Sequence, residues 1–135
     1  MSAAARLRGR DEGAEIIVLE RSKYVSFANC GLPYYVGGEI EDPSKLLLHT
    51  PQSLKAALNL DVRINSDVTA TDPGAHSVQV ANTETGEAYT PTYDHPILSP
   101  GALASRPPID GPDSPRVHTP LPVDDALALR PTSGT

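Results

Sequence analysis

A short apolar run near the N-terminus constrains the fold of this chain more than any other feature. The sequence EIIVLE, residues 15–20, places four consecutive apolar side chains between two acidic ones. A continuous apolar run of this length is typical of a strand that is buried on both faces of a parallel sheet. Together with the helices and strands predicted around it, this run indicates an α/β fold.

Three helices are predicted around this strand. Residues 2–11 are rich in helix formers. A second, short helix is expected after Cys30, with Pro33 in its first turn. A third helix is expected after Thr50, because this residue type caps helix N-termini and Pro51 suits the first helical position.

The middle of the chain predicts a small β insert at about residues 60–94. Polar and apolar residues alternate there, and turn signals separate the expected strands. The sequence ETG at residues 84–86 is predicted to form a hairpin turn. One more short buried strand, ending in a glycine turn, is expected at residues 95–102.

Proline crowding constrains the C-terminal part of the chain. The sequence has 14 prolines, and they are dense from Pro100 onward. Such a stretch is unsuited to a regular helix or a central strand. We therefore expect a domain over residues 1–103 and a proline-rich, loop-like tail over residues 104–135.

Composition argues against several classes of function. The net charge of -6 and the pI of about 5.0 disfavour nucleic acid and anionic membranes as partners. One cysteine allows no internal disulfide, and the four histidines show no metal-site spacing. Neither a signal peptide nor a membrane-spanning stretch is recognisable, so we expect a cytoplasmic protein without a metal.

Glu20 ends the predicted strand and suggests dinucleotide binding. In a βαβ unit of this kind, an acidic residue after the second strand accepts hydrogen bonds from ribose hydroxyls. The alternative is a solvated charge at a strand end. A glycine-rich loop and a first strand should precede the first helix. Because the chain begins at Met1, in or beside that helix, we expect both to be missing.

The segment SFANCGLPYY, residues 26–35, is the most specific part of the sequence. With the upstream SAAARLRGRDEGAEIIVLE, it resembles the FAD-dependent pyridine nucleotide-disulfide oxidoreductases, in the branch of the coenzyme A-disulfide reductases and NADH oxidase-like flavoproteins. The resemblance covers nearly the whole chain and only the N-terminal part of a longer architecture. It implies a partial Rossmann-like FAD-binding domain with a small antiparallel β insert. Further matching segments are SKLLLHTP, TETGEAYTPTYD, LSPGALASRPPIDG and VDDALALR.

The resemblance implies that Cys30 is a redox-active nucleophile that forms a mixed disulfide with coenzyme A. Since the sequence holds no second cysteine, any disulfide of Cys30 needs a sulfur from another molecule. A position at the start of a predicted helix favours the thiolate over the thiol. The alternative is an inert cysteine packed in the core.

The resemblance also implies cofactor and substrate contacts. The residues implied for FAD are Glu20, Arg21, Val68, Ser99 and Gly101. Those implied for the coenzyme A site are Ser2, Arg6, Ser26 and Asn29. Full-length members use NAD(P)H and form homodimers, and we expect the NAD(P)H-binding and dimerisation domains to be absent here.

Three functions remain open from the sequence. The first is a fragment of an FAD- and NAD(P)-dependent disulfide oxidoreductase acting on coenzyme A disulfide or a similar small thiol. The second is an NADH oxidase or peroxidase fragment in which Cys30 cycles through a sulfenic acid. The third is a truncated, marginally folded remnant without catalysis, because we expect the chain to be too short to turn over by itself.

Overall fold

The computed structural model describes residues 1–102, 105, 108 and 123–130. Contacts divide the chain into two compact units, Met1–Ser26 with His49–Ile97 and Phe27–Leu48 with Leu98–Thr135. The first unit holds α1 (Ser2–Arg8), β1 (Ile17–Leu19), α3 (Pro51–Leu58), β4 (Asp61–Arg63), β5 (Ser66–Asp72), β6 (Ser77–Asn82) and β7 (Ala88–Tyr89). The second holds the 3-10 turns η1 (Asn29–Gly31) and η2 (Pro43–Leu46) and the helices α2 (Leu32–Val36) and α4 (Val123–Leu129). A separate two-stranded sheet pairs β2 (Ser26–Phe27) with β3 (Leu47–His49).

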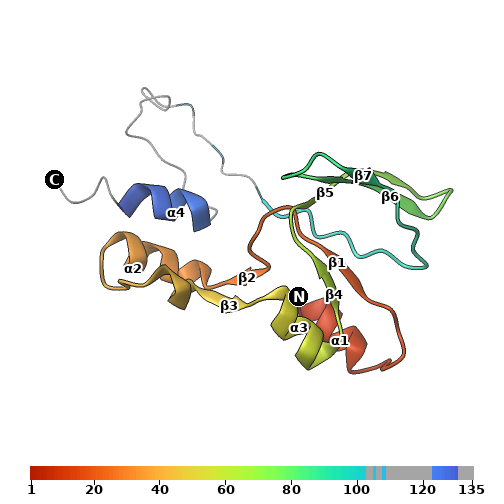
Figure 1. The fold of residues 1–135 in the computed structure, drawn as a ribbon, viewed down its shortest axis with the longest axis horizontal. Helices are drawn as coiled ribbons and strands as arrows, with labels where there is room; N and C mark the ends of the chain where they lie inside the picture. The colour runs from red at the N-terminus through yellow and green to blue at the C-terminus, as the bar shows by residue number, and fades with distance from the viewer. Residues whose placement is uncertain (103–104, 106–107, 109–122, 131–135) are drawn as a thin grey trace. The chain divides into compact units, whose positions relative to one another are not determined.

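The predicted parallel strand is present as β1. It pairs in parallel with β4, with Ile17 opposite Asp61 and Leu19 opposite Arg63, and both strands can be followed in Figure 1. The expectation that this strand is buried on both faces is wrong, since all three residues of β1 are only half-buried. The physical reason is that this sheet has two strands in the described part of the chain, so β1 has a neighbour on one edge only.

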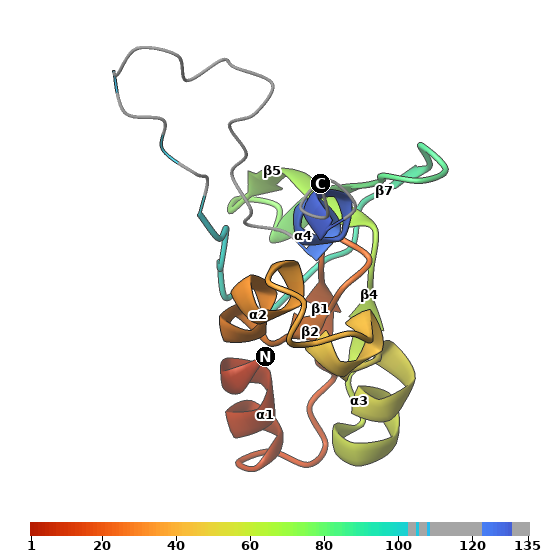
Figure 2. The same ribbon diagram turned by 90° about the vertical axis from the view of Figure 1, so that its left-hand side faces the viewer.

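A small apolar core supports the β1–β4 pair. Ile16, Leu54 and Leu60 are buried together, and Leu60 has no exposed surface. Figures 1 and 2 show α1 and α3 at the same end of this strand pair. The partly buried residues that pack against the core are Ala4, Ala14, Val18, Val25, Leu58 and Val62.

The helix predicted after Thr50 is confirmed as α3, and local chemistry explains both of its ends. Thr50 Oγ1 accepts a hydrogen bond from Ser53 N–H, and Ser53 Oγ accepts one from Thr50 N–H. This reciprocal capping box satisfies backbone donors that the first turn would otherwise leave unpaired. The helix ends at Asn59, which adopts a left-handed conformation with φ 48°.

The predicted β insert is confirmed as an antiparallel sheet in the order β5-β6-β7. The expected hairpin turn joins β6 to β7, and Gly86 supplies its positive φ of 76°. The prediction of a buried strand at residues 95–102 is wrong. Those residues are exposed and outside any strand, with Ile97 and Leu98 exposed by 67% and 68%. Proline at two positions of this segment removes donors that a strand ladder needs.

The prediction of a loop-like tail is wrong for residues 123–130, because these residues contain the helix α4. This interval lies between two prolines and has none inside it. Its buried residues Val123 and Ala126 stand one helical turn apart, and α4 contacts α2. Figure 1 shows the two helices side by side. The rest of the expected tail, apart from residues 105 and 108, lies outside the described residues.

Within the described part of the chain, no helix combines the length and apolar character that crossing a membrane requires.

Replacement of Leu60 by alanine tests the core of the first unit. We expect Leu60→Ala to lower the free energy of unfolding by about 2–5 kcal/mol, because a fully buried leucine leaves a cavity when it is truncated. Urea unfolding followed by far-UV circular dichroism measures this change. Leu98→Ala is the matched control, since this side chain is 68% exposed. Equal midpoints for the two variants would contradict the assigned core.

Candidate functional site

The predicted site residues are distributed over both units. Those in the first unit are Ser2, Arg6, Glu20, Arg21, Ser26 and Val68. Those in the second unit are Asn29, Cys30, Ser99 and Gly101. The geometry of each group is defined within its own unit.

Cys30 lies in the 3-10 turn η1 and is exposed. A cysteine packed in the core of this chain, the alternative considered from the sequence, is therefore excluded. Gly31, the next residue, is buried, and a β-carbon at this position would lie 2.8 Å from Leu46 Cδ2. Ala28 N–H also donates to Leu46 O at 2.8 Å. The backbone on both sides of Cys30 is thus held against Leu46 while Cys30 itself stays accessible.

The short helix expected after Cys30 is confirmed as α2, which begins at Leu32 with Pro33 in its first turn. Cys30 therefore lies in the turn before this helix. Leu32 and Tyr35 are the buried residues of α2. They anchor the helix to the unit and hold the turn that carries Cys30.

The Glu20 carboxylate lies at the carboxyl end of β1 and is held by its own chain. Its Oε1 accepts two hydrogen bonds at 2.8 Å, from the backbone N–H and the hydroxyl of Ser22. Its Oε2 accepts no hydrogen bond from the described residues, so an acceptor remains for a ligand. This half-buried, oriented carboxylate fits the ribose hydroxyls of a dinucleotide better than a freely solvated end charge would.

Two neighbouring strands hold the backbone of Glu20. Its N–H donates to Arg63 O and its carbonyl accepts from Ser66 N–H, both at 2.9 Å. Arg63 forms a 2.6 Å ion pair with Asp61. The hydrogen bonds that Arg63 donates, first to the Asp61 carboxylate and second to the Tyr89 oxygen, raise the pKa of Arg63 above its ordinary value. The Arg63 side chain therefore stabilises β4 beside Glu20 and is already bound to protein groups.

The two arginines of α1 differ in what they contact. Arg8 Nε donates to Leu58 O at 2.9 Å, and another guanidinium nitrogen donates to Asn59 O at 3.1 Å, so Arg8 binds the last carbonyls of α3. Arg6 is exposed and makes no hydrogen bond or ion pair within the described residues. Arg6 is therefore available to an anionic ligand, whereas Arg8 is a structural residue.

The other residues predicted to bind FAD lie at irregular backbone. Val68 is 38% exposed and lies at a bulge in β5, an edge strand of its sheet. Ser99 and Gly101 are exposed, and Gly101 has a φ of 77° that favours glycine. Arg21 is exposed beside Glu20. Backbone groups at such places are open to a ligand, and the roles of these residues stay predictions.

The other residues predicted for the coenzyme A site are polar and lie at the ends of short elements. Ser2 begins α1 and is exposed. Asn29 begins η1 and is exposed beside Cys30, while Ser26 in β2 is half-buried. Their assignment to substrate also stays a prediction.

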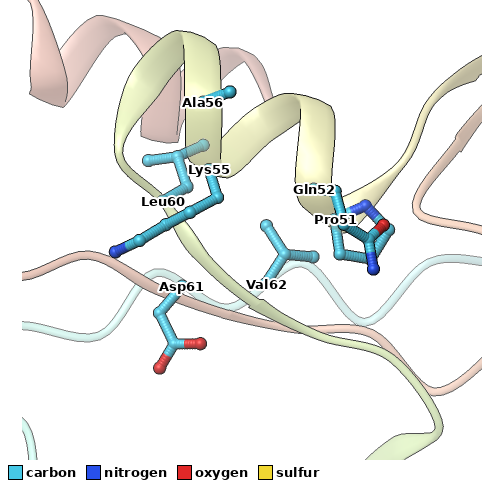
Figure 3. A pocket seen from close by; sticks show the side chains of 7 residues that line it. All are labelled: Pro51, Gln52, Lys55, Ala56, Leu60, Asp61 and Val62. Atoms are coloured by element: carbon cyan, nitrogen blue, oxygen red, sulfur yellow. The ribbon is translucent and has the colours of Figure 1, made fainter.

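A shallow hollow between α3 and β4 is separate from these residues (Figure 3). It contains no predicted site residue, and its Asp61 is already paired with Arg63. In the described part of the chain, no group of three or more His, Cys, Asp or Glu side chains could hold a metal ion. The residues that line the hollow are Pro51, Gln52, Lys55, Ala56, Leu60, Asp61 and Val62.

Sequence reasoning missed Arg130, which follows α4 and donates to the carbonyls of Ile40 and Glu41. The available signal was the proline-free interval from Val123 to Arg130. The contact itself joins residues about 90 positions apart, so no local pattern could have predicted it.

Several known proteins resemble this chain. The family described as "Pyridine nucleotide-disulphide oxidoreductase" matches residues 1–134. The coenzyme A disulfide reductase of Staphylococcus epidermidis is 39% identical over 105 residues, which are 78% of this chain and 24% of that protein. The corresponding enzyme of Staphylococcus aureus is 36% identical over 104 residues, 77% of this chain and 24% of its own. The chain thus spans about a quarter of the length of these curated relatives.

Solved structures give the same result. Reduced CoADR-RHD of Bacillus anthracis matches with a TM-score of 0.89 and 41% identity, covering 96% of this chain and 24% of that one. An NAD-dependent persulfide reductase from A. fulgidus matches at 0.83 and 32%, covering 93% and 24%. The water-forming NADH oxidase of Lactobacillus brevis matches at 0.84 and 32%, covering 96% and 29%. These matches confirm the family resemblance and the Rossmann-like α/β fold class predicted from the sequence.

Replacement of Gly31 by alanine tests how the Cys30 turn is held. We expect Gly31→Ala to lower the free energy of unfolding by about 1–3 kcal/mol, because its methyl group would overlap Leu46. Urea unfolding measures the loss, and faster amide hydrogen exchange at Ala28, whose N–H donates to Leu46 O, reports the displaced turn. Gly13→Ala is the control, since its methyl group would meet its nearest atom at an ordinary 3.5 Å. An unfolding midpoint and an Ala28 exchange rate for Gly31→Ala that both match this control would contradict the arrangement.

Proposed function

Because the chain belongs to the pyridine nucleotide-disulphide oxidoreductase family, we propose that it is the part of a coenzyme A-disulfide reductase that carries the redox-active cysteine and FAD contacts. The observation that carries this proposal is the exposed Cys30 in a turn whose next residue, Gly31, is buried. Similarity to coenzyme A disulfide reductases supports the choice of substrate. We further propose that the protein acts in the cytoplasm and that its complete form is a homodimer, as in the family.

The proposed reaction starts at the sulfur of Cys30. The thiolate attacks one sulfur of coenzyme A disulfide, the original S–S bond breaks, and one coenzyme A thiolate leaves. The product is a mixed disulfide between Cys30 and the second coenzyme A. FAD, when bound, supplies the two electrons that reduce this mixed disulfide, and it obtains them from NAD(P)H.

Residues of this chain have distinct proposed tasks around that reaction. Glu20 accepts hydrogen bonds from the ribose hydroxyls of FAD through the oxygen that Ser22 leaves open. Arg6 binds phosphate groups of coenzyme A, since guanidinium groups recognise phosphate well. Asn29 lies beside Cys30 and hydrogen-bonds the incoming substrate.

A second candidate is an oxidase or peroxidase reaction of the same cysteine. Similarity to a water-forming NADH oxidase favours it. In this case the Cys30 thiolate attacks one oxygen of hydrogen peroxide, the O–O bond breaks, and a sulfenic acid forms while hydroxide leaves and takes a proton from solvent to become water. The higher identity to coenzyme A disulfide reductases makes the first candidate the stronger one.

Mass spectrometry of the 135-residue chain distinguishes the two candidates. After incubation with coenzyme A disulfide, we expect a mass increase of one coenzyme A that dithiothreitol reverses. Cys30→Ser removes the only thiol and should abolish the adduct. No adduct on the unaltered chain, together with dimedone labelling of Cys30 after peroxide treatment, would instead support the sulfenic acid candidate.

Titration of FAD into the chain tests the role of Glu20. Hydrogen bonds to charged groups contribute about 1.5–3 kcal/mol, so we expect Glu20→Gln to weaken FAD binding by about tenfold or more. Flavin fluorescence measures the affinity, and far-UV circular dichroism checks the fold. Glu15→Gln is the control, because this exposed residue precedes β1. Equal FAD affinity for the two variants would contradict the assigned role.

A further inference from the structure

Arg130 connects three parts of the second unit. One guanidinium nitrogen donates to Ile40 O at 3.0 Å and to Glu41 O at 2.6 Å. The guanidinium carbon lies 4.6 Å from the centre of the Tyr35 ring. Tyr35 belongs to α2 and is only 6% exposed. A planar guanidinium suits both kinds of contact, because it stacks on aromatic rings and donates in fixed directions.

The same contacts lead toward Cys30 by two routes. In the first, a β-carbon at Gly31 would lie 3.5 Å from Ile40 Cδ1, so Ile40 packs beneath the backbone next to Cys30. In the second, Tyr35 anchors α2, the helix that continues directly from the Cys30 turn. Arg130 holds the carbonyl of Ile40 in the first route and the ring of Tyr35 in the second.

From these contacts we infer that Arg130 is a positioning residue that sets the direction in which the Cys30 thiol meets a disulfide. The inference rests on the proposed function, because it concerns attack by that thiol. Thiol–disulfide exchange is sensitive to direction, since the attacking and leaving sulfurs lie on opposite sides of the sulfur under attack. The segment that carries α4 thereby takes part in the geometry of the redox centre.

Variants of the full 135-residue chain test this inference. We measure the second-order rate constants of Cys30 with coenzyme A disulfide and with iodoacetamide, a small reagent that approaches from many directions. A displaced reacting group costs rate steeply, so we expect Arg130→Ala to slow the disulfide reaction by about tenfold. Its iodoacetamide rate should stay within about twofold of the unaltered chain, because exposure of the thiol is unchanged.

Two further variants test whether the effect on the disulfide reaction is specific to Arg130. Arg130→Lys keeps the positive charge but lacks the planar guanidinium that stacks on Tyr35, so it should restore only part of the disulfide rate. Arg10→Ala is the matched control, since the Arg10 side chain is exposed and makes no hydrogen bond or ion pair within the described residues. It should react like the unaltered chain. An unchanged disulfide rate in Arg130→Ala, or equal changes with both reagents, would overturn the inference.

A second variant, Ile40→Ala, keeps the inference testable if Arg130→Ala fails to fold. Ile40→Ala removes the side chain beneath Gly31 and keeps the carbonyl that Arg130 binds, and it should show the same selective loss of disulfide rate. If it instead reacts like the unaltered chain, the route through Ile40 is overturned.

Amide hydrogen exchange separates failure of this inference from failure of the proposed function. The Ala28 N–H donates to Leu46 O and the Gly31 N–H donates to Ala28 O, and we expect the exchange of both to be faster in Arg130→Ala. One outcome is faster exchange in Arg130→Ala together with no reaction of the chain with coenzyme A disulfide. In that case the proposed function is wrong, but Arg130 still stabilises the Cys30 turn. If Arg130→Ala shows unchanged amide exchange and a normal disulfide reaction, only the inference about Arg130 is wrong.

Discussion

The parallel pairing of β1 with β4 is the interaction on which the first unit depends. Its register places Leu19 opposite Arg63, so Glu20 follows at the strand end and is bound there by Arg63 O and Ser66 N–H. Side chains alternate between the faces of a strand, and a slip of one residue would turn Glu20 to the opposite face. The position of the candidate ribose-binding carboxylate is therefore a consequence of strand register.

In the second unit, close approach of Gly31 to Leu46 has the corresponding role. Leu46 has no exposed surface, and a β-carbon at residue 31 would lie only 2.8 Å from Leu46 Cδ2. The polypeptide can therefore turn tightly on a buried support and still leave Cys30 exposed. A thiol on a fixed support needs little reorganisation before it reacts, which is the property that nucleophilic catalysis requires.

Local chemistry explains which elements could be predicted from the sequence. The helix after Thr50 depends on its capping box, and the turn at Gly86 on a positive φ, so neighbouring residues were sufficient. By contrast, α4 depends on packing against α2 and on the contacts of Arg130, which lie far away in the chain. For the site, Cys30 was recognisable from its motif, whereas its support by distant groups was not. The strand expected at residues 95–102 failed because apolar residues without a pairing partner form no ladder.

The contacts of the arginines show which of these chemically equivalent side chains are available to a ligand. Arg8, Arg63 and Arg130 all bind protein carbonyls or a carboxylate, and each thereby connects two elements or stabilises one. The side chains of Arg6, Arg10 and Arg21 are exposed and bind no group within the described residues. Two of these, Arg6 and Arg21, are the arginines that the family resemblance assigns to coenzyme A and FAD, both of which carry phosphates. A guanidinium already bound to protein groups has fewer donors left for phosphate, and none of the three arginines bound to protein groups is assigned to a ligand.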